Sequence, residues 1–217
     1  MAGKTDTAEK ADKAAKPGKA LTVGVLALQG GVEEHVAILE SLGAHVTRVR
    51  LPRELDGLDG IVLPGGESST IDRLARAFEL AQPLRDAIRA GLPVLATCAG
   101  LIYLARELEN PAPGQQSLGV LDVVVRRNGF GNQRFSEERT VPVRLDEEDL
   151  AVEASFIRAP IVTSHGAGVE VIATVPESDG TPVVVGVRED NVIALSFHPE
   201  ENGDDRIHAR WLASLSV

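Results

Sequence analysis

The amino-acid sequence predicts an α/β protein, a three-layer sandwich with a mostly parallel central sheet. Apolar runs rich in Val, Ile and Leu alternate, in the first half of the chain, with segments whose apolar residues recur at helical spacing. Strands that are apolar throughout and separated by helices are typical of parallel sheets covered on both faces. With 217 residues the chain can bury a core that needs no disulfide or metal.

The elements of this first half follow one another regularly from residue 21. "LTVGVLALQG" predicts a strand, and "GVEEHVAILESLGA" predicts a helix whose apolar face includes Val32, His35, Val36, Leu39 and Leu42. "HVTRVR" and "DGIVLPGG" predict the next strands, the second one ending at Pro64. Two helices are expected from near Ser68 and from after Pro83 to about Arg89, and "GLPVLATC" predicts a further apolar strand.

The second half has a different pattern, in which strands predominate. "ENPAPGQQS" predicts a loop, and the strand-like segments after it predict mixed or antiparallel strands added to the first sheet. These segments are "LGVLDVVVRR", "RTVPVRL", "SFIRAPIVTS", "VEVIATV", "PVVVGVRE" and "NVIALSF". "RFSEERTVPVRLDEEDLAVEA" is acidic enough to suggest a solvated rim. "DDRIHARWLASL" predicts a closing helix with Ile207, Trp211 and Leu212 on its inner face.

Residues 1–20, "MAGKTDTAEKADKAAKPGKA", differ from the rest in composition. They are rich in Lys, Ala and Asp and lack the apolar core of a secretory signal. We therefore expect a disordered N-terminal tail over residues 1–20 and a single folded domain over residues 21–217. No run of 18 apolar residues occurs in the chain, so we expect no membrane span.

The net charge and the cysteine content limit the partners and the cellular compartment that the sequence favours. The chain has 22 basic and 32 acidic residues, a formal net charge of -10, which argues against a nucleic-acid surface. Arg126, Arg127 and Arg134 flank a Gly-rich turn and suggest a small anion site or a partner contact. A single cysteine, Cys98, excludes an intramolecular disulfide, and we expect a reducing compartment, by default the cytoplasm.

Cys98 lies where a predicted strand turns sharply into a helix, in "LATCAGL". Ala99 and Gly100 are small enough for the bend, and a nucleophile elbow has this layout, with the next backbone N–H contributing to an oxyanion hole. The positive end of the following helix would favour a thiolate. A free cysteine is also a common small core residue, so the elbow alone leaves both interpretations open.

"LSFHPE" ends a later strand with His198 and Glu200. A thiol nucleophile needs a base, and the base needs a carboxylate to fix its tautomer, so Cys98, His198 and Glu200 could form a complete catalytic triad. Pro199 fixes the backbone so that the carboxylate can turn back toward the ring. A lone histidine is more often structural, and it is the His-Pro-Glu sequence after an apolar strand that favours a catalytic role.

"LPGGESST" follows another strand, and its Pro and Gly residues predict a tight turn that exposes backbone N–H groups. Such groups can stabilise an oxyanion or hold a carboxylate. A plain turn into a helix capped by Ser68 or Ser69 is the alternative. The remaining histidines, His35, His45, His165 and His208, are scattered along the sequence, so we expect structural roles for them, with no metal and no organic cofactor.

"LPGGES", "TCAGL" and "SFHPE" resemble class I glutamine amidotransferases, which have a flavodoxin-like fold and a Cys-His-Glu triad. With "LALQGGVEEH", "RRNGFGNQ" and "FIRAP" they are similar to the family of glutaminase subunits of pyridoxal 5'-phosphate synthase, from about Val23 to His208. The resemblance implies hydrolysis of L-glutamine to glutamate and ammonia through a γ-glutamyl thioester, with Cys98 as nucleophile, His198 as base and acid, and Glu200 orienting His198.

The resemblance also implies the binding residues and the partner. Glutamine would contact Gly66, Glu67, Ser68, Arg127, Ile157 and Arg158, and the N–H groups of Gly66 and Ala99 would hold the oxyanion. An α-carboxylate calls for a guanidinium, although Arg127 and Arg158 could also be surface ion-pair residues. Ammonia would pass to a (β/α)8-barrel synthase subunit, with twelve glutaminases on a dodecameric core.

Two points remain open. Asn132 stands where the family usually has arginine, and Arg134 is a candidate to compensate. Two alternative hypotheses for the function are an amidotransferase subunit of the histidine or purine pathways and a non-catalytic DJ-1-like binding module. Proteins of the second kind lack the His-Pro-Glu motif.

Overall fold

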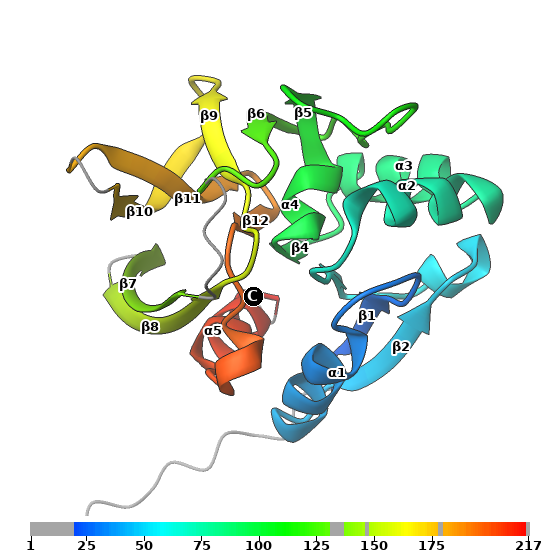
Figure 1. The fold of residues 1–217 in the computed structure, drawn as a ribbon. Helices are drawn as coiled ribbons and strands as arrows, with labels where there is room; N and C mark the ends of the chain where they lie inside the picture. Colours follow the sequence, from blue (N-terminus) through cyan, green and yellow to red (C-terminus); the bar gives the residue numbers. More distant parts are fainter. Residues whose placement is uncertain (1–19, 131–136, 146–147, 178–179, 216–217) are drawn as a thin grey trace, which may run out of the picture.

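The computed structural model describes residues 20–130, 137–145, 148–177 and 180–215. In this part of the chain a 12-stranded mixed sheet runs through the molecule, with helices on both of its faces (Figure 1). The α/β class and the layered architecture predicted from the sequence are confirmed. No helix in the described ranges is both long and apolar enough to cross a membrane.

Five strands form what we call the parallel region of the sheet, in the order β2-β1-β3-β4-β12. They are β1 (Thr22–Leu26), β2 (His45–Val49), β3 (Gly60–Leu63), β4 (Val94–Thr97) and β12 (Val192–Leu195). Every residue of β3 and β4 is buried, as expected for strands covered on both faces. Because these strands are parallel, the turns that follow β3, β4 and β12 meet at one edge, where ligands of such sheets bind.

Helices cover the two faces of this region. They are α1 (Val32–Ser41), α2 (Ser68–Ala77), α3 (Ala81–Arg89), α4 (Ala99–Leu104) and α5 (Arg206–Ser214), with short 3-10 turns η1 (Pro52–Leu55) and η2 (Glu200–Asn202). The apolar residues of α2, α3 and α4 belong to one core cluster, and those of α1 and α5 to another. Within β3, Ile61 and Leu63 join the first cluster and Val62 the second, so the sheet separates two helical layers.

The remaining strands, β5–β11, form the added region. They are β5 (Ala105–Leu108), β6 (Leu121–Arg126), β7 (Glu137–Leu145), β8 (Glu148–Phe156), β9 (Ile161–His165), β10 (Glu170–Pro176) and β11 (Pro182–Glu189). β11 pairs antiparallel with β12 and so joins the two regions. β10, β7 and β8 continue the sheet antiparallel, while β9 pairs with β11 and β6. The prediction of mixed strands added to a parallel sheet is confirmed.

Some elements differ from the predicted ones. The apolar run after Cys98 is a helix for only six residues, and it continues directly into β5, which the pattern did not indicate. The acidic segment expected as a rim contains most of the hairpin β7–β8, whose Val141, Val143, Val152 and Ala154 are fully buried. Helix α3 begins at Ala81, before Pro83, because proline is tolerated in the first helical turn.

Two predictions lie outside the described residues, at least in part. Residues 1–19 of the predicted tail are not described, so the division at residue 20 stays a prediction. Asn132 and Arg134 also lie outside the described ranges. Of the other arginines near that turn, Arg126 donates from Nε to Glu109 Oε2 at 2.7 Å, so it is paired within the chain.

Candidate active site

Cys98 is the first residue after β4 and directly precedes helix α4. Its φ is 45°, in the left-handed region that is costly for a residue with a side chain, as at the strained turn of a nucleophile elbow. Its N–H donates to Leu195 O of β12 at 2.8 Å, which fixes the turn against the neighbouring strand. A Cβ on Gly100 would lie 2.3 Å from Leu63 O, so only glycine lets α4 approach β3 this closely.

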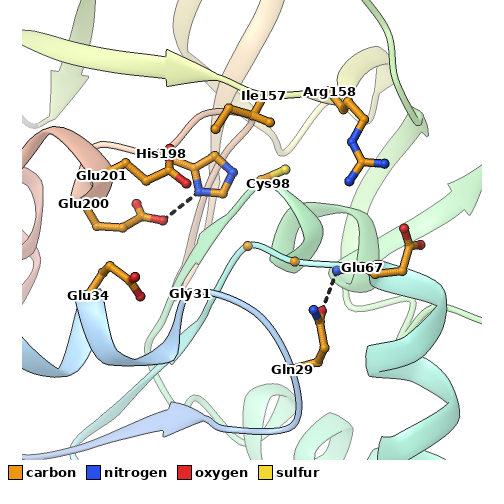
Figure 2. A pocket seen from close by; sticks show the side chains of 12 residues that line it. Gln29, Gly31, Glu34, Glu67, Cys98, Ile157, Arg158, His198, Glu200 and Glu201 are labelled. Atoms are coloured by element: carbon orange, nitrogen blue, oxygen red, sulfur yellow. Dashed lines mark hydrogen bonds and ion pairs between the residues drawn. The ribbon is translucent and has the colours of Figure 1, made fainter. Parts of the chain in front are cut away.

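His198 and Glu200 follow β12 and reach the same edge of the sheet. His198 Nδ1 lies 2.7 Å from Glu200 Oε1, and the other side of the ring faces Cys98 (Figure 2). All three side chains are largely buried. The backbone N–H of His198 donates to Ser155 O of β8 at 3.0 Å, so the added region supports the loop that carries His198. The structure therefore brings together the three residues predicted as a triad.

The charges in this cluster are stabilised by one another. Burial opposes the charged form of His198, but hydrogen bonds with Cys98 and Glu200 and the attraction of both groups outweigh it and raise its pKa to about 10. Burial would raise the pKa of Glu200, but His35 and His198 together hold it well below its usual value. Nδ1–H of His198 therefore donates to a carboxylate, and Nε2 is left for the sulfur.

The turn after β3 packs directly against this cluster. Gly65 N–H donates to Thr97 Oγ1 at 3.1 Å, and Gly65 O accepts from Gly31 N–H at 3.1 Å. A Cβ on Gly65 would lie 2.0 Å from Cε1 of His198, so any side chain here would displace the imidazole. The N–H of Glu67 donates to Gln29 Oε1 at 2.6 Å, which ties this turn to the end of β1 (Figure 2).

Two adjoining cavities open next to the Cys98 sulfur, and the first has a volume of about 250 Å³. The residues predicted to contact a substrate all line one or both of them; they are Gly66, Glu67, Ser68, Arg127, Ile157 and Arg158. Figure 2 shows the Arg158 side chain extending toward the sulfur side of the pocket, with Ile157 above the imidazole. The first helical N–H of α4, that of Ala99, has no partner within its own helix.

Arg127 is positioned by two side chains. Its guanidinium donates to Glu67 Oε1 at 3.1 Å and to Gln115 Oε1 at 3.1 Å. Gln115 in turn donates from Nε2 to Ser68 Oγ at 2.9 Å. Gln115 belongs to the loop between β5 and β6, and no sequence pattern indicated this role. It links two of the predicted binding residues that lie far apart along the chain.

The four histidines outside the triad lie in two kinds of environment, the core and the surface. His35 and His208, which are far apart along the sequence, form a pair in the fold, since His35 Nδ1 and His208 Nε2 lie 2.8 Å apart in the core behind Glu200. His45 is exposed on β2, and His165 is exposed at the end of β9, where its Nδ1 lies 3.1 Å from Gly166 O. Within the described ranges no group of three or more His, Cys, Asp or Glu side chains is arranged to hold a metal ion.

Comparison with known proteins gives a consistent result. Residues 25–216 match the SNO glutamine amidotransferase family. The chain is 62% identical over 193 residues to the pyridoxal 5'-phosphate synthase subunit PdxT of Corynebacterium glutamicum (strain R), covering 88% of this chain and 94% of the relative. It is 59% identical over 196 residues to the PdxT subunit of Cutibacterium acnes, covering 89% and 96% of the two chains.

Solved structures agree with this. A crystal structure described as a glutamine amidotransferase superposes with a TM-score of 0.80 at 41% identity, covering 90% of this chain and 99% of that one. A chain from the structure of PurLQS from Thermotoga maritima gives a TM-score of 0.63 at 19% identity, covering 91% and 99%, a likeness of fold alone.

Proposed function

The chain belongs to the SNO glutamine amidotransferase family, and on this premise we propose that it hydrolyses L-glutamine to L-glutamate and ammonia as the glutaminase subunit of a pyridoxal 5'-phosphate synthase. The observation that carries the proposal is the meeting of Cys98, His198 and Glu200 beside a cavity at the strand ends. The curated relatives named above are pyridoxal 5'-phosphate synthase subunits, which favours this pathway over the histidine and purine alternatives. Membership of an amidotransferase family disfavours a non-catalytic module.

In the first step, we propose that the Cys98 thiolate adds to the side-chain amide carbon of glutamine. The C–N bond then breaks, the His198 imidazolium gives its proton to the leaving nitrogen, and ammonia departs from a γ-glutamyl thioester. The raised pKa of His198, about 10, supports this, because the ring is then protonated at neutral pH and has a proton for the leaving nitrogen. Glu200 holds the ring with Nε2 toward the sulfur through the contact at Nδ1.

In the second step, neutral His198 removes a proton from water, and the hydroxide adds to the thioester carbon. The C–S bond breaks, glutamate leaves, and the Cys98 thiolate and His198 imidazolium are restored. The N–H groups of Gly66 and Ala99 are the proposed donors to the oxyanion in both steps. The placement of Ala99 at the first position of α4, with no intrahelical acceptor, supports its part.

Recognition of glutamine is assigned to the residues that line the two cavities. Arg127 and Arg158 are the proposed partners of the α-carboxylate, since a guanidinium matches a carboxylate in two parallel hydrogen bonds. Glu67, whose Oε1 accepts from Arg127 at 3.1 Å, lines the same cavity with Gly66 and Ser68 and suits the α-ammonium group. Ile157, which is 36% exposed, forms an apolar wall at the mouth.

The proposed partner is the (β/α)8-barrel synthase subunit, which would receive the ammonia. The finer proposal of twelve glutaminase and twelve synthase subunits rests on the family resemblance, and sedimentation of the mixed complex tests it. The proposed location is the cytoplasm, supported by the single cysteine, which the structure holds as a free thiol.

The test of the function is ammonia release from L-glutamine by the full chain, measured with and without the synthase subunit. We expect turnover that rises when the synthase joins and incorporation of the ammonia into pyridoxal phosphate. Cys98→Ala should abolish release while still binding the synthase. Full glutaminase activity in that variant would refute the mechanism, and equal turnover with and without the synthase would argue against the partner.

A further inference from the structure

Behind Glu200, on the side away from the pocket, lies a pair of histidines that the proposed chemistry does not use. His35 comes from α1 and His208 from α5, and both rings are fully buried. Neither lines the cavities beside Cys98. A polar ring in a core costs free energy unless its nitrogens have partners, so the arrangement of these partners is informative.

The contacts of His35 lead directly to the triad. Its Nε2 lies 3.3 Å from Glu200 Oε1 and 3.2 Å from Thr97 Oγ1. The Thr97 hydroxyl donates to the same Glu200 oxygen at 3.4 Å and accepts from Gly65 N–H at 3.1 Å. Glu200 Oε1 therefore receives donors from His198, Thr97 and His35, whereas Oε2 is buried without a hydrogen-bond partner in the described residues.

The positions of the protons on His35 and His208 can be derived from His208, which lies farthest from Glu200 in this series of contacts. Nδ1 of His208 is buried and has no partner among the described residues. A buried N–H without an acceptor is rarer and more costly than an unused lone pair, so Nδ1 is bare and the proton of His208 is on Nε2. Burial also lowers the pKa of His208 to about 3, which keeps it neutral.

This fixes the tautomer of His35. Nε2–H of His208 donates to His35 Nδ1 across 2.8 Å, so His35 accepts there and carries its own proton on Nε2. That proton points at Glu200 Oε1 and Thr97 Oγ1. We propose that His35, with its tautomer fixed by His208, is a positioning residue that directs Glu200 Oε1 at His198 and thereby holds the imidazole toward Cys98.

The inference rests on the proposed function for its kinetic effect, but its geometry can be tested without glutamine. Asparagine at position 35 places its amide near Nδ1 and keeps a contact for His208, while glutamine places an N–H donor near Nε2, within reach of Glu200. His35→Asn and His35→Gln are therefore a matched pair that differ in the donor to Glu200. The other charged groups around the network stay unchanged in both variants; they are Glu34, Glu67, Arg158, Glu201 and Asp204.

The first measurement is glutaminase kinetics with the synthase present. We expect His35→Gln to keep most of the wild-type kcat and His35→Asn to lose about tenfold in kcat, equivalent to ~1.4 kcal/mol, with KM unchanged. The second is the rate of iodoacetamide alkylation of Cys98, the only cysteine of the chain, against pH. His35→Asn should shift the pH of half-maximal alkylation upward by about one unit, since a misdirected Glu200 supports the imidazolium less well.

Equal kcat and equal alkylation curves in the two variants would overturn the proposal, whether both match wild type or both fall, because packing alone would not distinguish them. If glutamine proves not to be the substrate, the alkylation curves still decide the positioning role. If neither variant folds, His208→Gln keeps the donor to His35 Nδ1 and His208→Leu removes it. A shift of the alkylation curve in the leucine variant alone supports the inference, and identical curves overturn it.

Discussion

The parallel region and the added region contribute to the candidate site in different ways. The parallel region supplies Cys98, His198, Glu200 and the turn at Gly65, all in backbone turns whose atoms touch one another closely. The added region supplies Arg127, Ile157 and Arg158, on loops with more space around them. The difference suggests that the chemistry is built where strand ends converge, and that the added region completes recognition by supplying the two arginines and Ile157 beside the binding residues Gly66, Glu67 and Ser68 of the β3 turn.

This contrast predicts that changes to the triad and to Gly65 in the parallel region act on kcat and that changes in the added region act on KM. Among the contacts that cross the boundary, Ser155 of β8 pairs with the backbone of His198. Ile157 and Arg158 follow two and three residues later, so the recognition residues are held in register with the base. The residues of the chemistry and those of recognition therefore have separable roles, although Ser155 of β8 supports the backbone of both.

The largest effect is expected from Glu200→Gln. Without the carboxylate, His198 loses the charge-assisted hydrogen bond and the attraction that, together with those of Cys98, outweigh its burial, so we expect kcat to fall by about 10²–10⁴-fold. KM should change little, because Glu200 orients the base rather than the substrate. Steady-state glutaminase assays in the presence of the synthase check both values. A rise in KM with unchanged kcat would contradict the assignment of kcat effects to the triad and of KM effects to the added region.

The same variant predicts a change in pH dependence. In the wild type the pKa of His198 is raised from 6.5 to about 10, so the ring keeps its proton, and can protonate the leaving nitrogen, until the pH rises through about 10. In Glu200→Gln the negative charge of residue 200 no longer raises the pKa of His198. This pKa therefore falls, and the loss of kcat/KM begins at a lower pH. The pH profile of kcat/KM for both forms, measured between pH 6 and pH 10.5, checks the direction. An alkaline limb at the same pH in the two forms would contradict it.

The second largest effect is expected from Gly65→Ala. The added Cβ would lie 2.0 Å from His198 Cε1, so the ring must move by about an ångström, a displacement that costs about 10²-fold in rate. Gly168→Ala is a matched control, because neither glycine has a positive φ and the nearest atom to the Cβ added at Gly168 would be Glu189 Oε1, at an ordinary contact distance of 3.7 Å. Thermal unfolding of both variants separates loss of fold from loss of alignment. Wild-type kcat in a folded Gly65→Ala would show that the close contact is not needed.

Much of the parallel region could be predicted from sequence because its signals are local. Each strand is a short apolar run, each helix repeats at 3.6 residues, and Gly or Pro marks the turns between them. The triad was predictable because "TCAGL" and "SFHPE" carry their chemistry within a few residues. In the added region, β8 does alternate, with Leu150, Val152, Ala154 and Phe156 on one side, but its acidic residues obscured that pattern.

What the sequence could not reveal depends on long-range packing. His35 and His208 are 173 residues apart, and no local pattern links them, although the place of His35 on the apolar face of α1 was visible. Strand β5 was hidden because its four residues, AREL, follow the helix α4 without a break and include the charged Arg106 and Glu107, so they carry no strand pattern of their own. Gln115 lies in a segment that has only a loop composition.

In the added region we expect Arg127→Ala and Arg158→Ala to raise KM for glutamine by about 10- to 100-fold each, the loss of a charge-assisted hydrogen bond to the α-carboxylate. Their kcat at saturating glutamine should stay within a few-fold of wild type. γ-Glutamyl substrates that lack the α-carboxylate sharpen the test, since the variants and the wild type should use them equally. A loss of kcat in either variant would place that arginine in the chemistry.

The smallest effect is expected from Gln115→Ala, and it tests whether the added region positions its own binding residues. Gln115 accepts from Arg127 at 3.1 Å and donates to Ser68 at 2.9 Å, so its loss leaves Arg127 with Glu67 as its remaining side-chain partner and frees the Ser68 hydroxyl. We expect KM to rise about 3- to 10-fold, the effect of one ordinary hydrogen bond, with kcat unchanged.

Gln116→Ala is the matched control, because among the described residues only the backbone N–H of Gln116 is engaged, with Asp72 Oδ2 at 2.9 Å. In the double variant Gln115→Ala, Arg127→Ala the two effects should not add, because Gln115 acts through Arg127. Full additivity would mean that the amide contributes to binding independently of the arginine.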